Sequence, residues 1–106
     1  MKNVSSLVLS SAPDHESAKK IAKSLIEESL AACVHISNPI TSFYQWKGKT
    51  CEDQEYQLWI KTKEARFKEV SQKICERHPF EVPEVVSIPI EDGLPAYMEW
   101  ILEEVK

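Results

Sequence analysis

The sequence predicts an α+β fold, in which one antiparallel sheet carries helices on a single face. Three observations lead to this prediction. Residues 31–63 form two arms rich in β-branched and aromatic side chains, folded about Lys47-Gly48-Lys49. Two other stretches carry apolar residues at helical spacing. The prolines that fall within the predicted strands lie in only two of the four strands, which marks those two as sheet edges.

The amino-terminal part of the chain is predicted to form a strand followed by a helix. Residues 4–10 are short, apolar and β-branched, as is typical of a buried strand. Asp14 can cap a helix, and Glu16 in its first turn favours the positive end of the helix dipole. One apolar stripe follows at helical spacing, formed by Ala18, Ile21, Ala22, Leu25 and Ile26.

The two arms within residues 31–63 predict an unusually long hairpin. Each arm has roughly a dozen residues or more, whereas a typical strand has about 5–6. At about 3.4 Å per residue such an arm reaches roughly 40–50 Å, while a compact chain of this length has a radius of gyration near ~13 Å. The hairpin should therefore extend beyond its own domain. Its aromatic residues Phe43, Tyr44 and Trp46 are expected to contact a partner surface.

A second helix and a fourth strand complete the pattern. Thr62 is expected to cap the helix, and Pro79 ends it, because the residue before a proline avoids the α region. Residues 82–90 are expected to form a strand that contains Pro83 and Pro89.

The resulting order is β-α-β-β-α-β, a ferredoxin-like sandwich with an extra helix that begins at Pro95. Pro39 lies in the second strand, as Pro83 and Pro89 lie in the fourth. The proline-bearing strands are therefore expected at the edges, with the first and third strands inside.

Composition restricts the classes of protein and partner. With 106 residues, the chain is expected to form one domain over residues 1–106. An apolar fraction of 42% and a charged fraction of 28% are typical of soluble globular proteins. The net charge of −4, with lysines interleaved with glutamates, argues against nucleic-acid binding. No run of about 18 apolar residues is present, so no membrane-spanning segment is expected.

Cysteine and glycine usage narrows the chemistry further. Cys33, Cys51 and Cys75 are an odd, widely spaced set, which argues against a disulfide framework. The chain begins without the features of a secretory signal, so the cytoplasm is the expected location. Only two glycines are present, which excludes phosphate-binding glycine loops. No nucleophile elbow or catalytic triad is visible, so no enzymatic activity is expected.

His78, Glu81 and Glu84 form the first candidate site. They surround Pro79 and Pro83, and their imidazole and carboxylate groups suit copper, zinc or a similar divalent ion. The alternative is structural: His78 can satisfy carbonyl groups at the carboxyl end of the preceding helix.

Cys33 and His35 form the second candidate site. They alternate to the same face of one strand and can share an ion, although a cysteine in an apolar run is usually a core residue. Cys51 lies near the hairpin tip, is followed by the acidic residues Glu52 and Asp53, and is expected to be a surface thiol.

Lys61 interrupts an otherwise apolar central strand. It is expected either to extend from the strand end or to pair with a carboxylate. Tyr97 and Trp100 can line a ligand-binding cleft together with Lys61. Arg66 is a further candidate for ligand binding in this cleft. The alternative for both aromatic residues is a place in the core.

Five segments together resemble the CutA family, the divalent-cation tolerance proteins. They are LAACVHI (30–36), TSFYQWKGK (41–49), LWIKT (58–62), HPFEVPEV (78–85) and PIEDGLPAYMEW (89–100). The resemblance implies a ferredoxin-like subunit in a homotrimer, similar in architecture to PII signalling proteins. It also implies a link to tolerance of copper or another divalent cation. Phe43, Tyr44 and Trp46 are then expected at the trimer interface.

The copper site proposed for the family is only partly present. Ser10 stands where some bacterial members have cysteine, and Arg77 stands where a histidine precedes the His-Pro pair. Glu84 remains, with His78 as a nearby substitute. The resemblance therefore implies a trimeric protein that binds copper or other divalent ions. The alternatives are a PII-like sensor that binds a small anion through Lys61, or an adaptor for other proteins.

Overall fold

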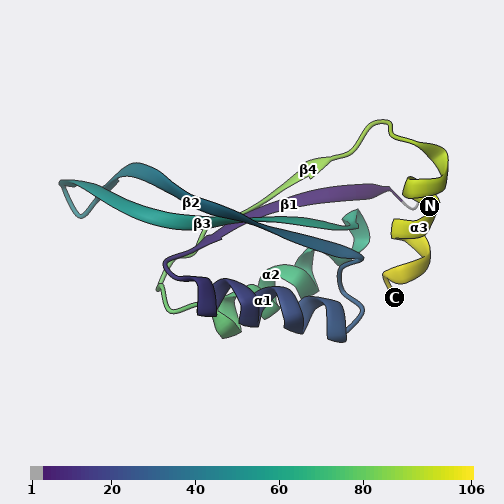
Figure 1. The fold of residues 1–106 in the computed structure, drawn as a ribbon, viewed down its shortest axis with the longest axis horizontal. Helices are drawn as coiled ribbons and strands as arrows, with labels where there is room; N and C mark the ends of the chain where they lie inside the picture. Colours follow the sequence, from purple (N-terminus) through teal and green to yellow (C-terminus); the bar gives the residue numbers. More distant parts are fainter. Residues whose placement is uncertain (1–3) are drawn as a thin grey trace.

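The computed structural model describes residues 4–106 as one four-stranded antiparallel sheet with its helices. The elements are β1 (Ser5–Ala12), α1 (His15–Glu27), β2 (Cys33–Trp46), β3 (Lys49–Lys63), a 3₁₀ turn (Glu64–Arg66), α2 (Phe67–Arg77), β4 (Val85–Pro89) and α3 (Pro95–Glu104). The strand order is β2-β3-β1-β4, which confirms that the proline-bearing strands lie at the edges. Figure 1 shows α1 and α2 on one side of the sheet and α3 at the end opposite the hairpin tip.

Helix α1 begins as predicted. The Asp14 side chain accepts a 2.7 Å hydrogen bond from the Ser17 amide, and the helix buries Ala18, Ile21 and Leu25 against the sheet. Strand β1 runs to Ala12, two residues beyond the predicted end, because Ala12 still pairs with Tyr56 of β3. The core between the sheet and the two long helices is formed by Val8, Leu58 and Ile60 from the strands and Ile21, Leu25, Val70 and Ile74 from the helices.

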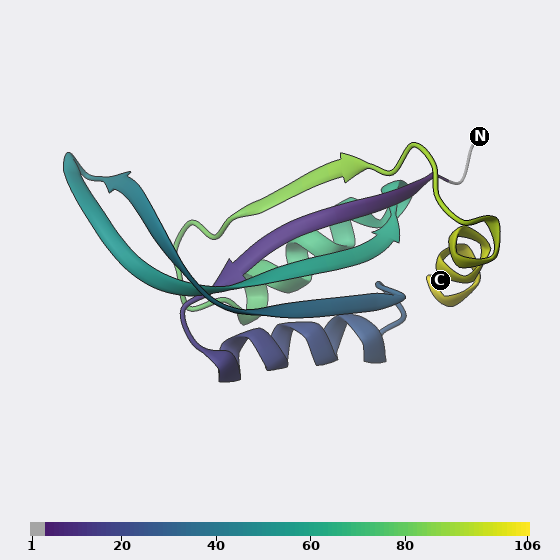
Figure 2. The same ribbon diagram turned by 45° about the horizontal axis from the view of Figure 1, so that its top comes forward.

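The long hairpin is present and extends past the helices, as Figure 2 shows. Strands β2 and β3 pair from Cys33 opposite Lys61 to Trp46 opposite Lys49, with one irregularity between Ile36 and Pro39. The hairpin gives the molecule a long axis of 43 Å and a radius of gyration of 14.3 Å. Lys47 and Gly48 have φ angles of 49° and 78°, and glycine adopts such a turn without a steric penalty.

The prediction that Thr62 caps the second helix is wrong. Thr62 lies within β3, fully buried opposite Ser6, and its hydroxyl donates a 2.6 Å hydrogen bond to the Leu30 carbonyl. The strand continues to Lys63 because β1 pairs with it to that point, and the chain then enters α2 through the 3₁₀ turn. Thr62 therefore holds the α1–β2 connection onto the sheet.

Strand β4 is shorter than predicted. It covers Val85–Pro89 instead of residues 82–90, so Pro83 precedes the strand. Proline lacks an amide hydrogen and restricts the residue before it, which keeps this part of the chain out of the ladder. Residues 79–84 instead form a loop beside the hairpin. Within residues 4–106, no helix is long and apolar enough to cross a membrane.

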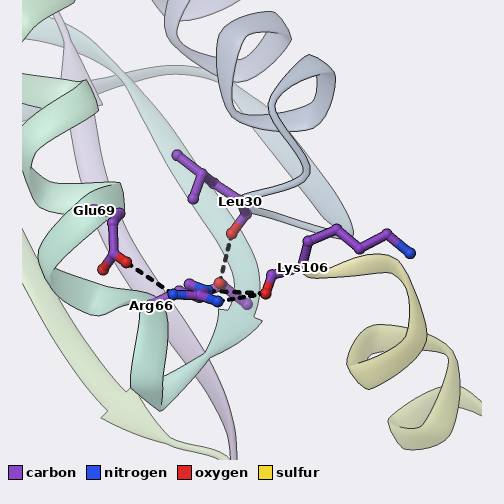
Figure 3. A network of polar contacts seen from close by, with 5 residues as sticks. Leu30, Arg66, Glu69 and Lys106 are labelled. Carbon is purple, nitrogen blue, oxygen red and sulfur yellow. Dashed lines mark hydrogen bonds and ion pairs between the residues drawn. The ribbon is translucent and has the colours of Figure 1, made fainter.

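Arg66 joins the 3₁₀ turn to the end of α3 (Figure 3). Its Nε and Nη2 atoms donate hydrogen bonds of 3.0 and 2.6 Å to the Lys106 main-chain oxygen, and its Nη1 atom lies 2.8 Å from Glu69. The Lys106 amide in turn donates to the Ser29 carbonyl over 2.9 Å. These contacts secure α3, which buries Ile101 against the rest of the chain.

Replacement of Thr62 by valine should lower the free energy of unfolding by about 1–2 kcal/mol, because the partly buried Leu30 carbonyl loses its hydroxyl donor. Urea denaturation of the variant measures this change. Thr41→Val is the matched control at an exposed position of β2 and should stay close to the parent. Equal stability of the two variants would contradict the anchoring role of Thr62.

Candidate functional site

The middle of the sheet face opposite α1 and α2 carries a group of apolar side chains, and neither of these two helices covers it (Figure 1). Leu9 of β1 lies opposite Trp59 of β3 and Val86 of β4, and residues opposite one another share a face of the sheet. Trp59 is 43% exposed, while Val86 and Ile88 are 46% and 45% exposed. We call this surface the open face, formed by Leu7, Leu9, Trp59, Val86 and Ile88. A surface of this kind on a single chain indicates an interaction site.

The open face continues onto the hairpin overhang. Tyr44 lies opposite Cys51, which alternates along β3 to the same side as Trp59. Tyr44 and Trp46 are 39% and 42% exposed. The Tyr44 hydroxyl donates to the Asp53 carboxylate, and this hydrogen bond raises the pKa of Tyr44 to about 12.

Phe43, the third residue expected at an interface, points to the other side of the hairpin and is still more exposed, at 69%. The contacts of these three aromatic residues with another chain remain a prediction.

A groove of about 810 Å³ separates the hairpin overhang from loop 79–84. Among residues 4–106, the lining includes the carboxylates of Glu55, Glu81 and Glu84 and no lysine or arginine. The Ser11 hydroxyl donates a 3.1 Å hydrogen bond to Glu55 and so orients one of these carboxylates. The groove is therefore acidic and attracts cations.

His78 anchors loop 79–84 to the sheet. It is only 8% exposed, its Nε2 atom lies 2.6 Å from the Ser11 carbonyl oxygen, and its Nδ1 atom accepts a 3.0 Å hydrogen bond from the Phe80 amide. A neutral imidazole that donates from Nε2 satisfies both contacts. The structural alternative predicted from the sequence is that His78 binds a main-chain carbonyl at the end of the preceding helix. His78 does bind a main-chain carbonyl, but this carbonyl belongs to Ser11 of β1 and not to α2.

The predicted metal ligands are therefore brought only partly together. Glu81 and Glu84 are exposed at the groove, whereas both ring nitrogens of His78 already have protein partners. Across residues 4–106, no group of three or more histidine, cysteine, aspartate or glutamate side chains is placed to hold a metal ion. Ser10 is fully buried, and its hydroxyl has no hydrogen-bond partner among residues 4–106.

Lys61 makes a contact that the sequence did not indicate. Its Nζ atom lies 3.1 Å from Nδ1 of His35, whose Nε2 atom lies 3.6 Å from the Cys33 sulfur. The register of β2 against β3 produces this arrangement, because Cys33 lies directly opposite Lys61. The sequence predicts separate candidate sites for Lys61 and for the Cys33–His35 pair. The structure brings all three side chains together in a single site.

Tyr97, Trp100 and Arg66, which are predicted to bind a ligand together with Lys61, lie on or near α3. The Tyr97 and Trp100 rings are 5.6 Å apart, and each side chain is 38% exposed. Arg66 is occupied by the Lys106 oxygen and Glu69.

Comparison with known proteins identifies the family. Residues 6–104 match the family model described as CutA1 divalent ion tolerance protein. The chain belongs to the CutA family. A relative from Thermus thermophilus, "Divalent-cation tolerance protein CutA", is 43% identical over 92% of this chain and 94% of its own length.

Two further comparisons extend this result. A solved structure of the divalent cation tolerance protein from Thermus thermophilus superposes with a TM-score of 0.94 at 41% identity, covering 96% of this chain and 99% of that one. The "Protein CutA homolog" of Xenopus laevis is 46% identical to this chain. The aligned region covers 84% of this chain but only 59% of that longer relative. These comparisons confirm both the family resemblance and the ferredoxin-like α+β fold.

Replacement of His78 by leucine should lower the free energy of unfolding by roughly 2 kcal/mol or more, because the buried Ser11 carbonyl and the partly buried Phe80 amide lose their partners. Urea denaturation gives this value, with His15→Leu at the exposed start of α1 as the control. If His78→Leu proved as stable as its control, the anchoring role of His78 would be wrong.

Proposed function

We propose that this chain acts as a homotrimeric, non-enzymatic divalent-cation tolerance protein in the cytoplasm. Membership of the CutA family and the names of its relatives support the role in cation tolerance. The structural observation that carries the proposal is the open apolar face, which continues onto an overhanging hairpin.

Burial of the open face explains why the protein assembles. Removal of apolar surface from water contributes roughly 25 cal/mol per Å², and Trp59, Val86 and Ile88 are large side chains left half-exposed. A hairpin that extends from one copy onto the face of the next forms a head-to-tail contact, and such contacts close into a ring when the rotation between successive copies completes a full turn. Three copies are the number that the family resemblance implies. Assembly also covers the exposed edges of β2 and β4, which otherwise invite aggregation.

The acidic groove supports the binding of a divalent cation. Carboxylate oxygens are common ligands of divalent ions, and Glu81 and Glu84 approach the groove from the loop that His78 anchors. Copper or another divalent ion would therefore be held first by these carboxylates. His78 would join them only by giving up one of its two hydrogen bonds.

A PII-like sensor of a small anion is the second candidate function. It is favoured by one observation: Lys61 contacts a neutral imidazole, and no described ion pair neutralises its charge. An anionic metabolite between subunits would supply the missing charge, with Tyr97 and Trp100 as stacking partners.

The cytoplasmic location and the absence of catalysis rest on separate grounds. Cys33, Cys51 and Cys75 are free thiols, which suits a reducing compartment. The sequence shows no catalytic triad or phosphate-binding glycine loop, and the names of the relatives describe cation tolerance rather than a reaction.

Replacement of Trp59 by glutamate should dissociate the trimer, because it places a charge in the centre of the buried face. Light scattering coupled to size-exclusion chromatography should return about three subunit masses for the parent and about one for the variant. Ile26→Glu is the matched control: Ile26 is also 43% exposed but lies on α1, on the other side of the sheet. A monomeric parent, or trimeric Trp59→Glu, would refute the assembly.

Combined Glu81→Gln and Glu84→Gln substitution should weaken copper binding by about tenfold, equivalent to about 1.4 kcal/mol of binding free energy. Isothermal titration of Cu²⁺ into the assembled protein measures the affinity. The control is Glu103→Gln with Glu104→Gln, which removes the same charge from exposed positions at the end of α3. The groove is not the copper site if the two double variants bind alike.

A further inference from the structure

A pair of side chains with metal-ligand chemistry lies outside the acidic groove. Cys33 is the first residue of β2, and His35 follows on the same face of that strand. The Cys33 sulfur and the His35 Nε2 atom face each other at 3.6 Å. In the single chain Cys33 is half-buried and His35 is exposed, and both lie on the same face of the sheet as Trp59, where copies of the chain are proposed to meet.

The separation of these two atoms matches a shared metal ion. Zinc binds cysteine sulfur at about 2.3 Å and histidine nitrogen at about 2.0–2.1 Å in tetrahedral geometry. Two such bonds at a tetrahedral angle place the sulfur and the nitrogen roughly 3.5–3.6 Å apart. The observed 3.6 Å therefore allows one ion to bind both atoms without movement of the backbone.

We propose that Cys33 and His35 form a two-ligand site for a thiophilic ion such as Zn²⁺ or Cu⁺. The remaining coordination positions are left to water or other exchangeable ligands, so the ion is bound reversibly. This site goes beyond the proposed groove, because thiolate and imidazole select softer ions than carboxylates do. It also lies on a different part of the molecule, at the start of β2 and not beside loop 79–84.

Lys61 sets the state of the pair before an ion arrives. Its ammonium group donates to Nδ1 of His35 over 3.1 Å, so the proton of the neutral imidazole resides on Nε2, toward the sulfur. Binding breaks the Cys33 S–H bond and releases that proton to solvent, while the imidazole proton moves from Nε2 to Nδ1. The ion then forms one bond to the Cys33 sulfur, in place of the S–H bond, and one bond to the His35 Nε2 atom, in place of the N–H bond. The ammonium group must then turn away, so Lys61 is a positioning residue that weakens binding.

Cobalt(II) is the probe for the site, because it adopts zinc geometry and its bond to a thiolate produces a charge-transfer absorption in the near ultraviolet. Titration of Co²⁺ into the intact protein should produce this band, and Cys33→Ser should abolish it. His35→Gln should abolish or strongly weaken it. The matched controls are Cys51→Ser and Cys75→Ser, which remove the other two free thiols and should retain the band.

The outcomes separate this site from the groove. The combined Glu81→Gln and Glu84→Gln variant should retain the cobalt band even if it loses copper affinity. Retention of the band in Cys33→Ser, or its loss in Cys51→Ser or in the groove variant, would overturn the assignment. Circular dichroism of each variant confirms that it is folded.

Lys61→Met provides a second, independent test. It keeps the length of the side chain and removes the donor to Nδ1, so Zn²⁺ affinity measured against a chelating indicator should rise by about tenfold, the usual scale of second-sphere effects. A structural role for Lys61 alone would leave the affinity unchanged or lower, and either result would overturn the role assigned to it here.

Discussion

The structure depends on the one-sided packing of its central strands. Along β3, Leu58 and Ile60 are buried under α1 and α2, while Trp59 between them is left half-exposed. The two long helices of the described chain both cover the same face. The apolar residues Trp59, Val86 and Ile88 on the other face are therefore left half-exposed in the single chain, and the most direct way to bury them is association with other copies. The core, the open face and the proposed assembly all follow from this constraint.

Side chains whose chemistry suits ligand binding often serve instead to hold main-chain groups. His78 joins the Ser11 carbonyl to the Phe80 amide, and Arg66 holds the Lys106 oxygen. Each contact fixes a loop or a helix against the sheet, where an unpaired main-chain group would be costly. The loop positioned by His78 presents Glu81 and Glu84 to the groove, so His78 supports the proposed cation site even without binding the ion.

The two proposed cation sites differ in the ions that they favour. The groove offers carboxylate oxygens in an acidic, solvent-accessible setting, which suits hard or borderline divalent ions. Cys33 and His35 offer one sulfur and one nitrogen, which suits softer ions. Neither provides the closed set of four ligands found in structural zinc sites. Reversible occupancy by more than one kind of ion agrees with a role in tolerance better than with a permanently bound cofactor.

The sequence by itself determined the architecture of this protein. Helical spacing, the Asp14 cap, the turn at Gly48 and the placement of Pro39 and Pro89 predicted the elements and the order of the strands, because these signals act locally along the chain. Only the tertiary structure decided the role of Thr62 and the contact between Lys61 and His35. Both depend on which residues of neighbouring strands stand opposite one another, and a shift of one residue in that register would turn every side chain to the other face.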